Sequence, residues 1–298
     1  MKNKAKIEIF LLCFNRPTSA IEAAKSIFEQ LDSNSKLIVS DNSTNNEVLE
    51  IIKKELPTVE LRLRGGLSSK DHFELCMSEA NEDYFCLFHD DDLMLPNYLN
   101  EIRNAIIEHP KAQAFGTNAI VHDNQKGLLG LSFDYPFRYK SFYTKEKLLH
   151  QYFGKGNCGI APFPSYLYKT KSFNTTSVER LHSKDLGKFS DVLLVLSQLE
   201  VSKVVWVNKP LIQYNLHEGN DGRIESLADR LLLLSELKRM LNKKSRILES
   251  YRLFVFSIAL EKRQNKRYKK IVNMLRIKRR ISIFTFYASL PCILKLWR

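Results

Sequence analysis

Three consecutive aspartates, Asp90, Asp91 and Asp92, are the residues of this sequence whose type and spacing most clearly suggest a chemical function. They follow His89, which comes directly after the apolar run 84–88. Neighbouring carboxylates at the end of a buried strand repel one another and lose hydration, so they need a counter-charge. Oxygen ligands favour Mg²⁺ or Mn²⁺, which also bind substrate phosphates. The triplet therefore predicts a divalent-cation site, and the alternatives are a solvated acidic turn or an N-cap cluster for a helix over 93–107.

Polar residues also follow three earlier apolar runs. The runs are 7–14, 36–40 and 59–63, and the polar residues after them are Arg16, Asp41 and Arg64. Helical patterns separate the runs, and this alternation predicts an α/β fold with a largely parallel sheet. Ligands of such sheets bind at the carboxyl ends of the strands. We therefore expect the four strand ends to bring their polar residues to one edge.

Capping residues and prolines indicate where the predicted helices of the α/β region begin and end. Thr18 or Ser19 is a candidate N-cap for the first helix, and Pro57 ends the second, over 46–56. The third covers 72–80, whereas the middle, 110–225, lacks a clear periodicity and suits substrate-facing loops. A long helical pattern begins at Ile224, with leucines at helical spacing from Leu227. We predict a domain over 1–225 and a helical, basic region over 226–298.

The segment Asn81–Leu99, NEDYFCLFHDDDLMLPNYL, resembles the central motif of family 2 glycosyltransferases with the GT-A fold. That motif is a buried strand, an acidic cluster and a proline a few residues on. The segments 7–17 (IEIFLLCFNRP) and 39–44 (VSDNST) are similar to the family's first two strands and their turns. The resemblance covers most of 7–220. It implies transfer of a sugar from a nucleotide-diphosphate sugar, as in the assembly of bacterial surface polysaccharides.

The resemblance also implies how the donor is held. Phe14 would stack near the base and Asp41 would hydrogen-bond a uracil- or thymine-like ring. Asp90 would reach the ribose. The remaining donor-binding candidates are basic side chains: Arg16, Arg64 and Lys70.

The same resemblance implies how a Mn²⁺ or Mg²⁺ ion is held. Asp91 would bind the metal that bridges the donor diphosphate, and Asp92 would support the site. His217 ends a segment similar to the family's L-x-x-Y-x-x-H, where the histidine lies near the metal. His89 departs from the family pattern, because many members have the first aspartate there, and this changes the set of ligands.

Inverting sugar transfer needs a base for the acceptor hydroxyl, and Asp191 is the candidate. It resembles the family's second acidic motif, which opens a helix under the acceptor site. The alternative is a first-turn acid that the helix dipole favours. Asp185 is the fallback.

The net charge of +13 is unevenly distributed. Residues 238–298 hold 18 Lys and Arg and 2 acids, so they carry +16, while residues 1–237 sum to −3. Within this tail the basic stretch 262–280 precedes the apolar stretch 281–296, which Pro291 interrupts. The pattern predicts contact with an anionic membrane surface and a lipid-linked saccharide acceptor. The alternative is that the tail packs on the catalytic domain.

The cysteines and the apolar runs indicate in which compartment the protein resides and how it meets a membrane. The five cysteines suit neither a zinc site nor a small disulfide framework, which favours a reducing compartment. No run is long enough to span a membrane. We therefore expect a cytoplasmic protein, peripheral at the inner face of the cell membrane. The alternative function is a non-catalytic nucleotide-sugar-binding or scaffolding protein of the same fold. We expect no nucleic-acid partner, because no nucleic-acid-binding fold is recognised and the acidic triplet lies in a domain without basic excess. Nucleic-acid binding by residues 238–298 is a third class.

Overall fold

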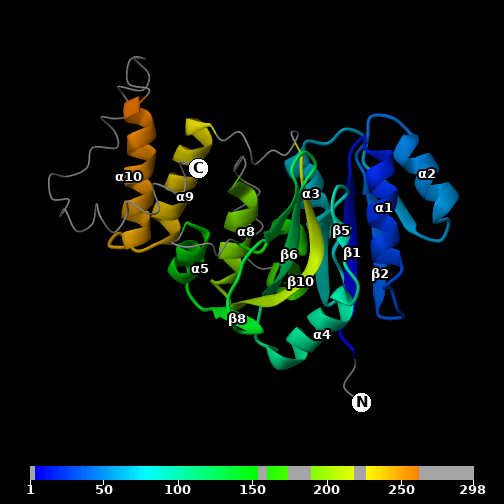
Figure 1. The fold of residues 1–298 in the computed structure, drawn as a ribbon, viewed down its shortest axis with the longest axis horizontal. Helices are drawn as coiled ribbons and strands as arrows, with labels where there is room; N and C mark the ends of the chain where they lie inside the picture. The colour runs from blue at the N-terminus through cyan, green and yellow to red at the C-terminus, as the bar shows by residue number, and fades with distance from the viewer. Residues whose placement is uncertain (1–3, 154–159, 174–188, 218–225, 262–298) are drawn as a thin grey trace. The chain divides into compact units, whose positions relative to one another are not determined.

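The structure is a computed structural model that describes residues 4–153, 160–173, 189–217 and 226–261 (Figure 1). The chain divides into two compact units. The first comprises 1–143, 159–185 and 194–218, and the second comprises 144–158, 186–193 and 219–298. The predicted boundary after residue 225 and the basic tail from 262 lie at or beyond the limits of the described residues, so both stay predictions. No described helix is long and apolar enough to cross a membrane.

A ten-stranded sheet, counted over the described residues, forms the centre of the first unit. Its order is β3-β2-β1-β4-β9-β6-β10-β5, with β7 beside β6 and β8 beside β10. The bounds are β1 Ile7–Cys13, β2 Ser35–Asp41, β3 Glu60–Leu63, β4 Tyr84–His89, β5 Leu93–Met94, β6 Ala114–Asp123, β7 Gly127–Leu131, β8 Tyr139–Phe142, β9 Leu167–Lys169 and β10 Val204–Leu216. β1 to β4 are mutually parallel, and β6 is parallel to β10. The predicted α/β fold with a mostly parallel sheet is confirmed.

The first four strands end in register. Cys13 of β1 pairs with Asp41 of β2, and Asp41 pairs with Leu63 of β3. On the other side of β1, Leu12 pairs with His89 of β4. The residues that follow these strands therefore meet at one edge of the sheet, as the alternation of strands and helices predicts.

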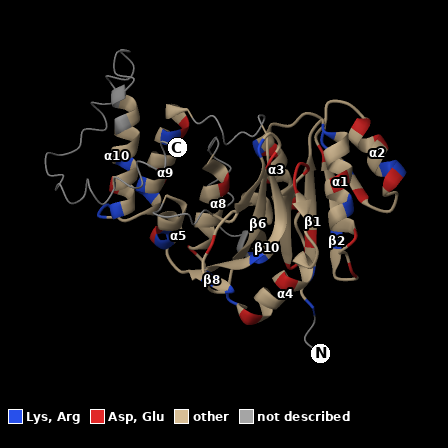
Figure 2. Cartoon of the chain, in the orientation of Figure 1, with Lys and Arg blue, Asp and Glu red and all other residues tan. Residues whose placement is uncertain are grey.

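The helices of the first unit cover the sheet and are amphipathic. They are α1 Pro17–Phe28, α2 Glu47–Glu55, α3 Ser69–Glu79, α4 Tyr98–Glu108 and the short α6 Thr170–Phe173, together with the 3₁₀ turn η1 Phe163–Ser165. α1 buries four residues at helical spacing, namely Ala20, Ala23, Ala24 and Ile27. Figure 2 shows charged residues on α1, α2 and α4, while the strands carry few. This distribution is typical of a sheet buried on both faces.

Two expectations about helix starts need correction. α1 begins at Pro17 with Arg16 as its N-cap, not at Thr18 or Ser19, because the fixed φ of proline suits the first helical position. The Asp triplet does not cap a helix over 93–107. Leu93 and Met94 form β5, and α4 starts at Tyr98 with Asn97 as its N-cap.

The middle of the chain is more regular than its sequence indicates. Half of the sheet, β6 to β10, comes from residues 110–225. β10 is thirteen residues long and pairs with β6, with register shifts between Val207 and Pro210 and between Pro210 and Ile212. β10 then pairs antiparallel with β5, with Gln213 opposite Leu93. This pairing brings the end of β10 to the turn that holds the Asp triplet.

The described part of the second unit is helical. It contains α5 Lys145–Tyr152, the start of α8 Ser190–Gln198, α9 Leu227–Met240 and α10 Arg246–Glu261. The helical pattern predicted from Ile224 is confirmed from Leu227 onward, and Ile224 itself lies outside the described residues. α9 begins with a capping box between Ser226 and Asp229, and α10 stacks Tyr251 on Phe153 with ring centroids 4.9 Å apart.

Candidate functional site

Asp90 joins the end of β1 to the end of β4. Its side chain is fully buried. The Phe14 backbone N–H donates to Asp90 Oδ2 at 2.9 Å, and the Arg16 guanidinium pairs with Asp90 Oδ1. Burial raises the pKa of Asp90 to about 6, although Arg16 and the Phe14 N–H act in the opposite direction. Both carboxylate oxygens of Asp90 thus already bind groups of the turn after β1. The contact with a ribose that the resemblance implies stays a prediction.

Asp91 is the most accessible carboxylate of the triplet. Its Oδ2 lies 2.9 Å from Arg16 Nη1 and 2.7 Å from His217 Nε2. Burial favours a raised pKa for Asp91, but the nearby His89, Arg16 and His217 outweigh it, and the pKa lies below its ordinary value. Asp91 is therefore ionised and contacts two basic side chains, Arg16 after β1 and His217 after β10.

Asp92 has one oxygen that the described part of the chain leaves without a hydrogen-bond partner. The Asn215 N–H donates to Asp92 Oδ1 at 2.8 Å, while Oδ2 is buried and accepts no hydrogen bond from the described residues. Burial, followed by the negative charge of Asp91, raises the pKa of Asp92 well above its usual range. An orphaned, buried carboxylate oxygen is costly unless a cation or donor reaches it.

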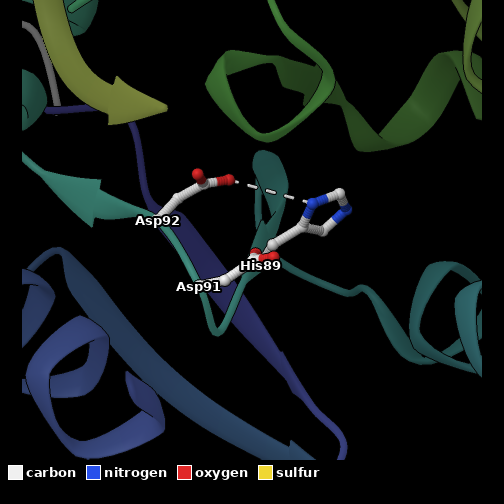
Figure 3. A group of neighbouring side chains, drawn as sticks. All are labelled: His89, Asp91 and Asp92. Carbon is white, nitrogen blue, oxygen red and sulfur yellow. Dashed lines mark ion pairs between the residues drawn. The ribbon is translucent and has the colours of Figure 1, made fainter. Parts of the chain in front are cut away.

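His89 completes a group of candidate metal ligands with Asp91 and Asp92. One potential ligand atom from each lies within 4.8 Å of the other two. His89 Nδ1 is 3.8 Å from Asp92 Oδ2, and Figure 3 shows the carboxylate facing the imidazole ring. His89 Nε2 is buried without a partner among the described residues, and burial lowers the pKa of His89, which favours the neutral, ligating form. The donor set fits a divalent cation.

Two residues at the candidate metal site, His89 and Asn215, could not be assigned a role from the sequence alone. His89 is visible there only as a departure from the family pattern. Asn215 holds both neighbouring aspartates, because its Nδ2 donates to the Asp91 carbonyl at 2.7 Å in addition to the contact with Asp92. Its position two residues before His217 is the signal that could have identified it.

The turns after β1 and β2 are clamped together beside the triplet. The Asn15 N–H donates to Ser43 Oγ at 2.8 Å, and the Thr44 N–H donates to Asn15 Oδ1 at 2.9 Å. Asp41 is buried and accepts from the Ser43 N–H at 3.0 Å, whereas Phe14 is 49% exposed. An exposed ring after β1 and a fixed carboxylate at the end of the neighbouring β2 are compatible with the base-binding roles predicted for these two residues.

Arg64 is engaged by the protein itself. Its Nη1 donates to Glu79 on α3 at 2.8 Å, and its Nε donates to Ser40 Oγ at 2.8 Å. His72 Nε2 also lies 2.8 Å from Ser40 Oγ, and burial, followed by the charge of Arg64, lowers the pKa of His72 to about 4. A diphosphate would have to compete with Glu79 for Arg64, so the donor contact of Arg64 stays a prediction.

The predicted roles of Lys70 in donor binding and of Asp191 as the base stay predictions. Lys70 lies in the first turn of α3, with its Nζ 3.8 Å from Glu74. Asp191 lies in the first turn of α8 within the second unit, is half-buried, and accepts from the Val192 N–H at 2.7 Å. Asp185, the fallback base, lies outside the described residues.

Comparison with known proteins identifies the family. Residues 8–170, more than half of the chain, match the model of "Glycosyl transferase family 2". The chain belongs to this family. It is therefore a nucleotide-sugar glycosyltransferase, and the Asp triplet at the end of β4 falls inside the matched region.

Solved structures support the GT-A-like fold of this family 2 glycosyltransferase. The fold is similar to S. aureus TarS residues 1–349 in complex with UDP-GlcNAc, with a TM-score of 0.61, 13% identity, and coverage of 83% of this chain and 71% of that one. The complex of the same TarS fragment with UDP has a TM-score of 0.60 and 14% identity. The match covers 83% of this chain and 70% of that one. The match to longer TarS spans 42% of that chain, with 83% of this chain covered, 14% identity and a TM-score of 0.55. No curated protein sequence matches the chain.

Proposed function

We propose that this family 2 enzyme transfers a sugar, with inversion, from a nucleotide-diphosphate sugar to a hydroxyl of a saccharide acceptor, and that it needs a divalent cation. The observation that carries the proposal is the convergence of four parallel strand ends on the group His89, Asp91 and Asp92. The bound nucleotide sugar of TarS makes a uridine diphosphate sugar the first donor to try.

The cation would be held by Asp91 and Asp92, with His89 as a nitrogen ligand and His217 beside Asp91. Mn²⁺ accepts both oxygen and imidazole ligands, which favours it over Mg²⁺ here. When bound, such an ion neutralises the charge that develops on the departing diphosphate. Arg16 and Phe14 would lie against the diphosphate and the base respectively, and Asp41 would fix the orientation of the base.

Asp191 would act as the base of the reaction. It takes the proton of the acceptor hydroxyl while that oxygen attacks the anomeric carbon, and the bond from that carbon to the diphosphate oxygen breaks. The nucleoside diphosphate leaves with the bonding electron pair. A single displacement of this kind inverts the configuration at the anomeric carbon.

A donor screen tests the proposal. We expect one nucleoside diphosphate or its sugar, tested at about 100 times its Kd with Mn²⁺, to stabilise the full chain by about 2.7 kcal/mol and raise its Tm by about 4–5 °C. The shift should disappear with excess EDTA. Mass spectrometry of the same mixture with added acceptors should then show sugar transfer. Binding without transfer to any acceptor would indicate a non-catalytic binding protein, and the absence of any nucleotide effect would contradict the proposed function.

We propose further that the acceptor is lipid-linked and that the tail holds the enzyme at an anionic membrane surface. The support is the +16 charge of residues 238–298 beside an apolar stretch. A Lys or Arg near an anionic surface contributes about 1 kcal/mol. Replacement of Lys266, Arg267, Lys269 and Lys270 by Gln in the full chain should therefore reduce co-sedimentation with phosphatidylglycerol vesicles by at least about tenfold. Equal partitioning of the variant and the original chain would contradict membrane attachment, and phosphatidylcholine vesicles serve as the uncharged control.

A further inference from the structure

Arg16 occupies the coordination space of Asp91, the carboxylate on which the metal site depends. Arg16 Nη1 lies 2.9 Å from Asp91 Oδ2, and His217 Nε2 lies 2.7 Å from the same oxygen. Arg16 Nη1 is also 3.1 Å from His217 Nε2, so these two basic groups meet at one oxygen atom of Asp91. A carboxylate oxygen offers about two acceptor sites, and the two neighbours of Asp91 Oδ2 fill them.

Arg16 is the movable member of this trio. Its side chain is 38% exposed, against 24% for His217 and 14% for Asp91. Its other amino group, Nη2, pairs with Asp90 Oδ1. The guanidinium can therefore give up Asp91 and still be anchored by Asp90 at the end of β4.

Electrostatics sets the direction of this movement. A guanidinium is charged at every pH that a folded protein meets, so at Asp91 it opposes a divalent cation in the group His89, Asp91 and Asp92. The donor diphosphate is the complementary partner for the displaced group, because the planar guanidinium matches phosphate oxygens in a bidentate manner.

We propose that Arg16 is an internal counter-ion that Asp91 exchanges for the divalent cation, and that the released guanidinium then binds the donor diphosphate. This inference rests on the metal site of the proposed function and deepens it. Arg16 opposes binding of the metal alone and favours binding of the donor once the metal is in place. Metal and donor thereby reinforce each other through one side chain.

The exchange predicts opposite effects of one substitution on two ligands. Arg16→Gln keeps hydrogen-bond donors and removes the charge. We expect it to bind Mn²⁺ alone about tenfold more tightly than the original chain, measured from the free Mn²⁺ signal in electron paramagnetic resonance. With saturating Mn²⁺, we expect the variant to bind UDP at least about tenfold more weakly in calorimetry. A residue that merely supported the structure would weaken both ligands together.

Arg103→Gln is the matched control. Arg103 also forms a two-atom ion pair with a carboxylate, Asp32, at 2.8 and 2.9 Å, but Asp32 precedes β2 at the opposite edge of the sheet. This variant should bind Mn²⁺ and UDP like the original chain. If Arg16→Gln does not fold, the double variant Arg16→Gln/Asp90→Asn removes the buried carboxylate with its partner, and it should also bind Mn²⁺ more tightly than the original chain.

The binding experiments distinguish failure of the proposed Arg16 exchange from failure of the proposed metal site. If the original chain binds Mn²⁺ and Arg16→Gln binds it equally or more weakly, the exchange is wrong and the metal site stands. If no chain binds Mn²⁺, the metal site is wrong and the exchange fails with it. Tighter Mn²⁺ binding together with unchanged UDP binding would contradict the release of Arg16 to the diphosphate.

Discussion

Asp91→Asn is expected to reduce sugar transfer by about 10³-fold or more and to remove the Mn²⁺-dependent stabilisation by nucleotide. Asp91 is the one carboxylate of the triplet whose pKa its neighbours hold below the ordinary value, so it supplies the negative charge for a cation. Asparagine has the same shape and still accepts from Arg16 and His217, so the fold should persist. Initial rates, and thermal shifts with UDP with and without Mn²⁺, measure the two effects.

Asp83→Asn provides the control for this substitution. Asp83 directly precedes β4, at the end opposite Asp91, is exposed, and accepts from the Lys6 N–H at 3.0 Å, which asparagine can also do. It should leave transfer and the Mn²⁺ effect unchanged. Retention of full activity by Asp91→Asn would exclude Asp91 as a metal ligand and, with it, the proposed metal dependence.

The first four strands are predictable from the sequence because each is a short apolar run closed by polar residues. β1 and β4 match their expected bounds within one residue. β10 is harder, because Asn208 and Pro210 interrupt its apolar pattern as a turn would. The structure accommodates Pro210 with a register shift against β6, which the local sequence does not specify.

β6 illustrates a second limit of prediction. Asn118 is fully buried in the middle of this strand, where a polar residue argues against a core strand. Its Nδ2 donates to the Phe133 carbonyl at 2.8 Å and to Asn208 Oδ1 at 2.9 Å. Residues distant in the sequence thus satisfy this side chain, and a local pattern cannot anticipate them.

The same distinction applies to the candidate site. The strand-end rule locates Arg16 and Asp90 correctly at one edge, because strand order and direction alone determine which edge they share. It does not reveal that Arg64 pairs with Glu79, since that contact depends on how α3 packs beside β3. Position at the edge is therefore predictable for these side chains, whereas the availability of each for a ligand depends on tertiary packing.

Asp191→Asn is expected to lower kcat by about 10²–10⁴-fold with little change in donor binding, because a general base acts on the acceptor proton and not on the nucleotide. The alternative role, a first-turn acid stabilised by the α8 dipole, predicts a loss of about 0.3–1 kcal/mol of stability and no loss of kcat. Steady-state rates, the UDP shift in Tm with Mn²⁺, and urea unfolding distinguish the two roles in one preparation.

Asp229→Asn is the matched control, because Asp229 is also a first-turn acid, on α9 of the same unit. It should keep kcat within about twofold of the original chain, although loss of part of the capping box lowers stability by about 1 kcal/mol. If Asp191→Asn retains kcat and loses only stability, Asp191 is a structural acid like Asp229. The search for the base would then move to Asp185, with Asp185→Asn measured by the same rates.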